Sequence, residues 1–275
     1  MTLIVQLTDL HLRPRGVPAL RVSETNMMAE RAVATVEAMT PRPDAVIITG
    51  DLTDKGTEQE YENLLGILER FSVPWYVIPG NHDSSPVLKR ALATHSWASK
   101  SPADNLHFAV DIGPVRLIGL DTSVPGKAHG ELDSPQIAWL DEELSAHGTQ
   151  PTIVALHHPP IVTGIAHMDR TRLQDAAALE AILSRHDQVQ RVICGHVHRP
   201  IFATFAGRPL TIGPGTAHQI VFNLEEGGPS AFNFEPPAFL VHKWSDASGF
   251  VTHMAYVEAF EGPYPFWPDK SVTWS

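Results

Sequence analysis

Short runs of apolar residues recur along the chain, and five of them end directly in polar or glycine-rich turns. The runs cover Leu3–Leu7, Asp44–Thr49, Pro74–Pro79, Thr152–Leu156 and Arg191–Cys194. Continuous apolar runs of this length, bounded by turn residues, are typical of strands that are buried on both faces. The pattern therefore predicts a largely buried sheet.

Segments with helical periodicity separate these strands. We expect helices over Ser23–Met39, Thr57–Leu68, Ser84–Ala93, Ser134–His147 and Leu173–His186. Thr57 and Glu60 have the spacing of a capping box, in which each side chain bonds the backbone N–H of the other residue. Residues Leu106–Ile112 and Val115–Leu120 predict a hairpin. The alternation of strands and helices predicts βαβ units and an α/β fold class.

The chain changes character after Pro200. Strand-like segments follow one another without a strong helix between them, at Ile201–Phe205, Pro209–Ile212, Ala238–Trp244 and Phe250–Val257. We expect these late strands, within residues 201–260, to make a second sheet that packs on the first. Residues 1–260 would then form the main domain, and residues 261–275 a C-terminal tail rich in proline and aromatic residues.

Composition narrows the class of protein. The 31 acidic and 20 basic side chains of the 275 residues give a net charge of −11. This charge argues against a basic face for duplex DNA or RNA, so no stable nucleic-acid partner is expected.

No apolar run approaches the 18 residues of a membrane-spanning helix, and we expect no membrane partner. The first residues resemble a strand more than a leader. With one cysteine, Cys194, no internal disulfide can form, which suits a cytoplasmic protein.

Polar residues cluster where the five predicted strands end. They are Asp9 and His11, then Asp51, then Asn81, His82 and Asp83, then His157 and His158, and last His196 and His198. Because the carboxyl ends of strands in an open α/β sheet face one crevice, these residues are expected to converge. Each motif alone is typical of a turn, a cap or a strand end. Five of them in succession indicate a metal site.

The chemistry of these groups suggests which metals they bind. Imidazoles and carboxylates without thiolates favour Mn, Fe, Co, Ni or Zn. The candidates exceed the four ligands of one tetrahedral ion, so two divalent ions are predicted. Asp51 is the best bridge, because a carboxylate has two oxygens. Two ions roughly 3.5–4 Å apart would hold the attacking and leaving oxygens of an in-line displacement.

The motifs D-x-H, G-D, G-N-H-D, H-H-P-P and G-H-x-H, in this order, resemble those of the calcineurin-like metallophosphoesterases. Within that superfamily the chain is similar to the bacterial class III cyclic-nucleotide phosphodiesterases, and most similar to their glycerophosphodiesterase branch. The motifs run from Asp9 to His198, and PGTAHQ at Pro214–Gln219 extends the likeness. The resemblance implies a four-layer αββα sandwich, followed here by a C-terminal extension.

The resemblance also implies roles for single residues. It assigns one metal to Asp9, His11, Asp51 and His198, and the other to Asp51, Asn81, His157 and His196. His82 matches a histidine that contacts the phosphate and assists the leaving group. Asp51 and His82 are thus the catalytic candidates, and Asn81, His82 and His218 the substrate-binding candidates.

Three further residues have open roles. Asp83 either orients His82 or caps the next helix. His158 is expected to support the site without binding substrate. Arg13 either meets a phosphate or is solvated.

The implied activity is metal-dependent hydrolysis of small phosphodiesters, such as cyclic nucleotides, glycerophosphodiesters or other alkyl diesters. A hydroxide between the two ions (Mn, Fe, Co or Zn) would attack phosphorus in line. A phosphomonoesterase, a nuclease and a non-catalytic scaffold are the alternatives. The acidic charge counts against a nuclease, and the complete ligand set counts against a scaffold. The tail residues Tyr264, Phe266 and Trp267 favour a homo-oligomer, because an exposed apolar patch is costly in a free monomer.

Overall fold

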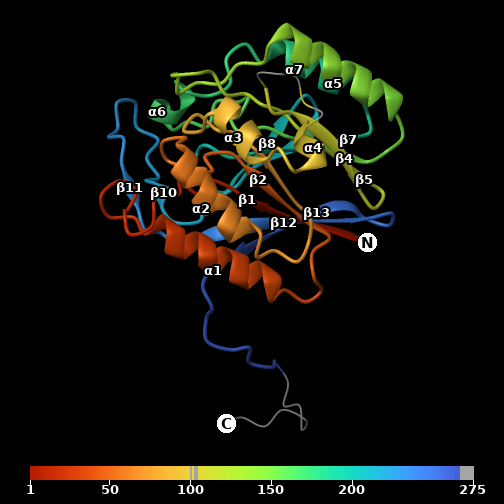
Figure 1. The fold of residues 1–275 in the computed structure, drawn as a ribbon. Coiled ribbons are helices and arrows are strands. Elements are labelled where there is room, and N and C mark those ends of the chain that lie inside the picture. The colour runs from red at the N-terminus through yellow and green to blue at the C-terminus, as the bar shows by residue number, and fades with distance from the viewer. Residues whose placement is uncertain (100, 102–104, 267–275) are drawn as a thin grey trace.

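A computed structural model describes residues 1–99, 101 and 105–266 of the chain. Trp267, the last residue of the predicted aromatic contact, lies outside the described residues. Two sheets lie face to face, and helices cover the outer side of each (Figure 1). The predicted four-layer αββα sandwich is confirmed.

The first sheet has five strands in the order β13-β12-β1-β2-β3. Their bounds are β1 Thr2–Leu7, β2 Ala45–Thr49, β3 Trp75–Ile78, β12 Ala238–Ser245 and β13 Gly249–Tyr256. β1, β2 and β3 are parallel, whereas β12 is antiparallel to β1. The helices on its outer side are α1 Thr25–Glu37, α2 Glu58–Leu68 and α3 Ser85–Ala91, with the short α4 Ser96–Ser99 after them.

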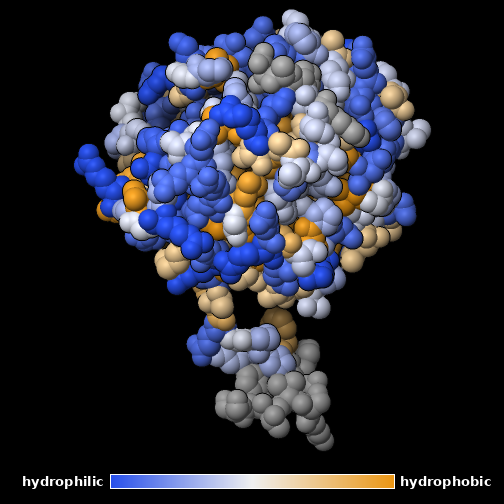
Figure 2. All heavy atoms as spheres, viewed as in Figure 1, coloured by the Kyte–Doolittle hydropathy of each residue, from blue (hydrophilic) through white to orange (hydrophobic). Residues whose placement is uncertain are grey.

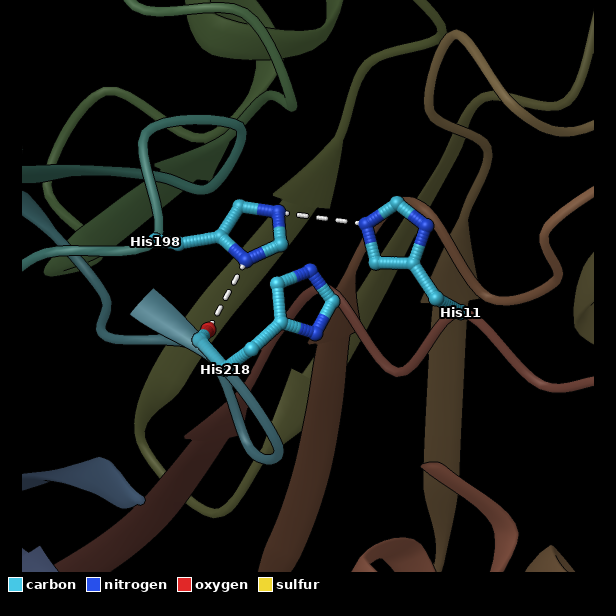
Figure 3. A group of neighbouring side chains, drawn as sticks. All are labelled: His11, His198 and His218. Atoms are coloured by element: carbon cyan, nitrogen blue, oxygen red, sulfur yellow. Dashed lines mark hydrogen bonds between the residues drawn. The ribbon is translucent and has the colours of Figure 1, made fainter. Parts of the chain in front are cut away.

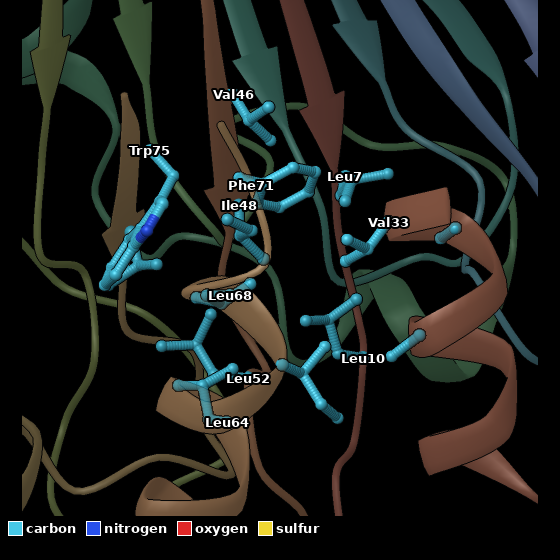
Figure 4. Close-up of a cluster of buried hydrophobic side chains, with 14 of the residues drawn as sticks. Leu7, Leu10, Val33, Val46, Ile48, Leu52, Leu64, Leu68, Phe71 and Trp75 are labelled. Atoms are coloured by element: carbon cyan, nitrogen blue, oxygen red, sulfur yellow. The ribbon is translucent and has the colours of Figure 1, made fainter. Parts of the chain in front are cut away.

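The helices pack on this sheet through apolar side chains at helical spacing. In α1 the buried positions include Ala29, Ala32, Val33 and Val36, which share one face of the helix. They join strand residues such as Leu7 in one apolar cluster (Figure 4). Burial of such side chains contributes about 1.5–3 kcal/mol for each Val or Leu.

The second sheet has six strands in the order β4-β5-β6-β7-β9-β8. Their bounds are β4 Phe108–Ile112, β5 Val115–Gly119, β6 Thr152–Ala155, β7 Val189–Cys194, β8 Ile201–Phe205 and β9 Arg208–Ile212. The helices α5 Ser134–Ala146 and α7 Ala177–Ser184 pack on its outer face. The short helix α6 Ala166–Asp169 and a two-stranded ribbon, β10 Gln219–Ile220 and β11 Phe232–Asn233, lie outside both sheets.

The late strands are divided between the sheets, so the expectation that residues 201–260 form the second sheet is wrong. β8 and β9 extend the second sheet beside β7, whereas β12 and β13 return to the first sheet beside β1. An apolar strand has the same sequence pattern whichever open edge it pairs with, and the pairing is decided by contacts distant in sequence.

One polar network crosses the apolar layer between the sheets. Gln6 on β1 donates from Nε2 to the carbonyl oxygen of Cys194 on β7 at 2.8 Å and to Thr49 Oγ1 at 3.0 Å. Its Oε1 lies 3.0 Å from Nε2 of the buried His242 on β12. Buried hydrogen bonds of this kind fix how two layers sit against each other.

The surface seen in Figure 2 is a mosaic in which hydrophilic side chains surround small apolar patches. After β13 the described part of the tail leaves the body of the molecule (Figure 1), and the Phe266 side chain is 99% exposed. Within the described residues, no helix is both long and apolar enough to cross a membrane.

Candidate metal centre

The predicted ligands meet where the carboxyl ends of the two sheets come together. Asp9 and His11 follow β1, Asp51 follows β2, and Asn81 follows β3 in the first sheet. The second sheet supplies one histidine after β6 and two after β7, namely His157, His196 and His198. The expected convergence is found, although the ligands come from the strand ends of two sheets and not from those of a single sheet.

The first group consists of Asp9, His11, Asp51 and His198, all buried, with one ligating atom of each within 4.8 Å of the others. His11 Nε2 lies 3.1 Å from His198 Nε2 and 3.5 Å from Asp51 Oδ2. His198 Nε2 lies 3.3 Å from Asp9 Oδ1. Figure 3 shows the rings of His11 and His198 turned toward each other beside His218. This is the set that the family resemblance assigned to one metal.

The second group lies on the other side of Asp51. His157 Nε2 is 3.5 Å from Asp51 Oδ1 and 3.3 Å from Asn81 Oδ1. His157, His158 and His196 also bring ligating atoms within 4.8 Å of one another. Asp51 therefore directs one oxygen to each group, as a bridging carboxylate requires.

Backbone carbonyls decide which ring nitrogen of two histidines carries the proton. His157 Nδ1 lies 2.8 Å from the carbonyl oxygen of Thr49, and His198 Nδ1 lies 3.1 Å from that of His218. A carbonyl oxygen only accepts, so Nδ1 is the protonated nitrogen in both rings. Each Nε2 keeps a lone pair that faces the carboxylates, which is the arrangement of a metal-binding histidine.

Unusual backbone geometry is concentrated at the same residues. Among the described non-glycine residues nine have positive φ, and five of them are Asp9, His11, Asp51, His196 and His198. Such conformations cost of order 1–3 kcal/mol each and cluster at functional sites. Gly80 allows the close approach, because a Cβ there would lie 2.3 Å from the backbone nitrogen of Asp51. The strand ends are thus bent to aim side chains at one point.

Burial and neighbouring charges shift the pKa values of these groups. Burial raises the pKa of Asp9 to about 6, although His157 opposes the shift. Burial alone would lower the pKa of His157, but the Asp51 carboxylate raises it to about 9. Burial, with His11 nearby, lowers the pKa of His198 to about 3. Buried carboxylates and imidazole lone pairs gathered in this way fit a divalent cation, which supplies the missing positive charge.

A cavity of about 460 Å³ opens onto both groups. Its lining includes seven of the nine proposed metal and substrate residues, namely His11, Asp51, Asn81, His82, His196, His198 and His218. The rest of the lining includes the apolar side chains of Leu20, Met168, Ile220 and Phe232. No Lys or Arg occurs among the described residues that line the cavity.

His82 and His218 both face this cavity. His82 Nδ1 donates to the carbonyl oxygen of Asp54 at 3.0 Å. Its Nε2 makes no hydrogen bond to a residue that the structure describes. His218 packs on the His198 ring with centroids 4.7 Å apart, and its Nδ1 lies 3.3 Å from Ser23 Oγ.

Neither role expected for Asp83 is found. Its carboxylate accepts from the backbone N–H groups of Leu52, Thr53 and Gly80, and from the hydroxyl of Tyr61. The helix α3 begins after Ser84 without a side-chain cap. Asp83 therefore holds the turn after β2 against the turn after β3, because its carboxylate accepts from backbone donors of both turns.

Arg13 is neither free in solvent nor directed at the cavity. Its Nη1 lies 2.7 Å from Glu60 Oε1 and 3.5 Å from Asp54 Oδ2. His158 is fully buried and its Nδ1 lies 2.7 Å from Thr122 Oγ1, which agrees with a supporting position.

Asp54 is a site residue that the sequence did not single out. Its carboxylate lies 3.8 Å from Nδ1 of His11 and 3.8 Å from Nδ1 of His82, and it lines the cavity. Burial would raise its pKa, but contacts with His11 and the Lys55 charge lower the value to about 2. Asp54 follows the G-D motif by three residues, and this turn position resembles any solvated Asp in the sequence alone.

Comparison with known proteins gives consistent matches. The family model of calcineurin-like phosphoesterases matches residues 2–200. The chain is 34% identical over 269 residues to a probable glycerophosphodiester phosphodiesterase of Arcobacter nitrofigilis, covering 98% of both chains. It is 36% identical over 211 residues to a cAMP/cGMP dual specificity phosphodiesterase of Mycobacterium tuberculosis, covering 74% of this chain and 64% of that one.

Solved structures support the fold. A dimetal phosphatase from Danio rerio superposes with a TM-score of 0.63 at 15% identity, covering 94% of this chain and 99% of that one. A purple acid phosphatase from yellow lupin superposes with a TM-score of 0.66 at 14% identity, covering 93% and 51%.

Proposed function

The chain belongs to the calcineurin-like phosphoesterase family and is a metal-dependent phosphodiesterase, and we propose that it holds two divalent cations through seven residues and hydrolyses small diesters between them. One cation is held by Asp9, His11, Asp51 and His198, and the other by Asp51, Asn81, His157 and His196. The observation that carries this proposal is the position of Asp51, whose two carboxylate oxygens lie 3.5 Å from ring nitrogens of the two separate groups.

Each set of residues has a part in the reaction. Divalent cations held at these groups would supply positive charge to the phosphate oxygens and would lower the pKa of the attacking water molecule. Asn81 and His218 contact the phosphate from the cavity wall. His82 in its doubly protonated form would give the proton on Nε2 to the leaving oxygen, and the neutral ring would keep the Nδ1 proton that bonds the Asp54 carbonyl.

The cavity wall favours a diester over a monoester. A monoester carries one more negative charge at neutral pH, and none of the described lining residues is Lys or Arg to hold it. The apolar side chains of Leu20, Met168, Ile220 and Phe232 suit the carbon skeleton of an ester group. Glycerophosphodiesters and cyclic nucleotides, the substrates in the names of the relatives, are therefore the classes to test.

The test is metal-dependent turnover with matched substrates. The protein is stripped with a chelator, reloaded with Mn, Co, Zn or Fe, and assayed with bis-p-nitrophenyl phosphate, p-nitrophenyl phosphate, cyclic AMP and a glycerophosphodiester. We expect hydrolysis of diesters that depends on added metal and is lost in Asp51→Asn, since this change removes a charge shared by both groups. Faster turnover of the monoester than of every diester would contradict the proposal, as would full activity of Asp51→Asn.

We further propose that the tail mediates self-association. Tyr264 and Phe266 are 57% and 99% exposed, which is costly for a free monomer. Deletion of residues 262–275 should reduce the mass measured by light scattering. An unchanged mass would show that the tail is not the contact.

A further inference from the structure

His196 is held by a hydrogen bond unlike those of the other proposed ligand histidines. Its Nε2 lies 2.9 Å from Oγ1 of Thr171, a residue between α6 and α7. The Thr171 hydroxyl donates its only proton to the carbonyl oxygen of Met168 at 3.0 Å. Because that proton is already used, Oγ1 can only accept from His196. The bond therefore places the ring proton of His196 on Nε2.

The consequence is a reversed tautomer. His157 and His198 carry their proton on Nδ1, since each Nδ1 faces a backbone carbonyl. His196 carries it on Nε2 and offers Nδ1 to a ligand. Its backbone N–H is fixed as well, because it donates to the Asp9 carboxylate at 3.1 and 3.2 Å. The ring can thus meet a cation in one orientation only.

We propose that Thr171 is a positioning residue that holds His196 in the Nδ1-binding tautomer and thereby sets the affinity of one of the two cation sites. The inference rests on the proposed function, because it takes His196 as a ligand. It goes beyond that function in assigning a role to a residue outside the proposed metal-binding and substrate-binding set.

The position of Thr171 gives this bond a second consequence. Met168, which accepts from Thr171, lines the cavity, as do Thr171 and His167. The segment that forms part of the wall for the ester group therefore also orients His196. The hydrogen-bonded chain from Met168 through Thr171 to His196 joins the two.

The test is a metal titration of Thr171→Val, which keeps the shape of the side chain and removes the acceptor. Apo protein is titrated with Mn²⁺, and free Mn²⁺ is followed by electron paramagnetic resonance. We expect the wild type to bind two equivalents. In Thr171→Val one equivalent should be unchanged and the other about 10–100-fold weaker, as found when partners of ligand histidines are removed. Thr171→Ser should restore the affinity.

A matched control separates the hydroxyl from a general effect of valine. Thr211 is buried and its hydroxyl has no hydrogen-bond partner among the described residues, so Thr211→Val should leave both equivalents unchanged. Equal binding by Thr171→Val and the wild type would overturn the proposal while leaving the proposed function intact. A wild type that binds no Mn²⁺ and hydrolyses no diester would instead overturn the proposed function.

The tautomer can be measured without any variant. Long-range ¹H–¹⁵N spectra of the Zn²⁺-loaded wild type distinguish protonated from metal-bound ring nitrogens. We expect a proton on Nε2 of His196 and on Nδ1 of His157 and His198. A proton on Nδ1 of His196 would overturn the proposal even if Thr171→Val failed to fold.

Discussion

At the scale of single residues, one ring nitrogen of His82 is hydrogen-bonded to the backbone, and the other can act on a substrate. Its Nδ1 bonds the Asp54 carbonyl, and its side chain is 35% exposed in the cavity. We expect His82→Ala to slow the hydrolysis of alkyl diesters by about 10²-fold or more, the usual contribution of general acid catalysis. An activated p-nitrophenyl ester, whose leaving group needs no proton, should lose less than about 10-fold.

The measurement for His82 is kcat for alkyl and aryl diesters at one metal load. His147→Ala, at the end of α5, serves as the control and should leave both rates unchanged. If His82→Ala slowed the alkyl and aryl diesters equally, the histidine would position phosphate without donating a proton.

Residue chemistry decided how much of the site could be predicted. Asp51, His157 and His198 were found because each follows an apolar run, and because imidazoles and carboxylates at strand ends have few structural reasons to gather. Asp54 and Thr171 were missed. Their roles come from hydrogen bonds and ion pairs with residues on other loops, and neither residue type nor spacing reveals such partners.

At the scale of elements, the start of α2 depends on the capping box that the sequence predicted. Thr57 Oγ1 accepts from the Glu60 N–H at 3.3 Å, and Glu60 Oε2 accepts from the Thr57 N–H at 3.2 Å. We expect Thr57→Ala to lower the free energy of unfolding in urea by about 1 kcal/mol, the usual cost of losing a cap. Thr57→Ser should retain most of the stability, and equal stability of all three proteins would contradict a role for this cap.

The capping box also shows why local elements are easier to predict than their arrangement. It lies within four residues and is complete in the sequence. Glu60 also forms an ion pair with Arg13, and Arg13 pairs with Asp54. These ion pairs form only when the fold brings two loops together. For the same reason the late strands were located correctly, while their division between two sheets was not foreseen.

At the scale of the whole molecule, the two sheets carry different halves of the candidate metal centre, so their junction matters to the site. His242 lies in that junction and bonds Gln6, which reaches across to Cys194. Burial, with Arg191 nearby, lowers the pKa of His242 from 6.5 to about 3. Between pH 6.5 and about 3, His242 is protonated in the unfolded chain but neutral in the folded chain. The free energy of unfolding must therefore fall as the pH falls through this range.

This linkage gives a prediction for acid stability. A group with such a shift changes the free energy of unfolding by up to about 1.4 kcal/mol per pH unit below its unfolded pKa. The wild type should therefore lose about 2 kcal/mol through His242 between pH 6.5 and 5. His242→Gln does not titrate, and its urea-unfolding free energy should decline less steeply over this range. His147→Gln, at the end of α5 and away from the junction, should decline as the wild type does. A variant at position 242 that declines as steeply as the wild type would show that the junction tolerates a charged imidazole.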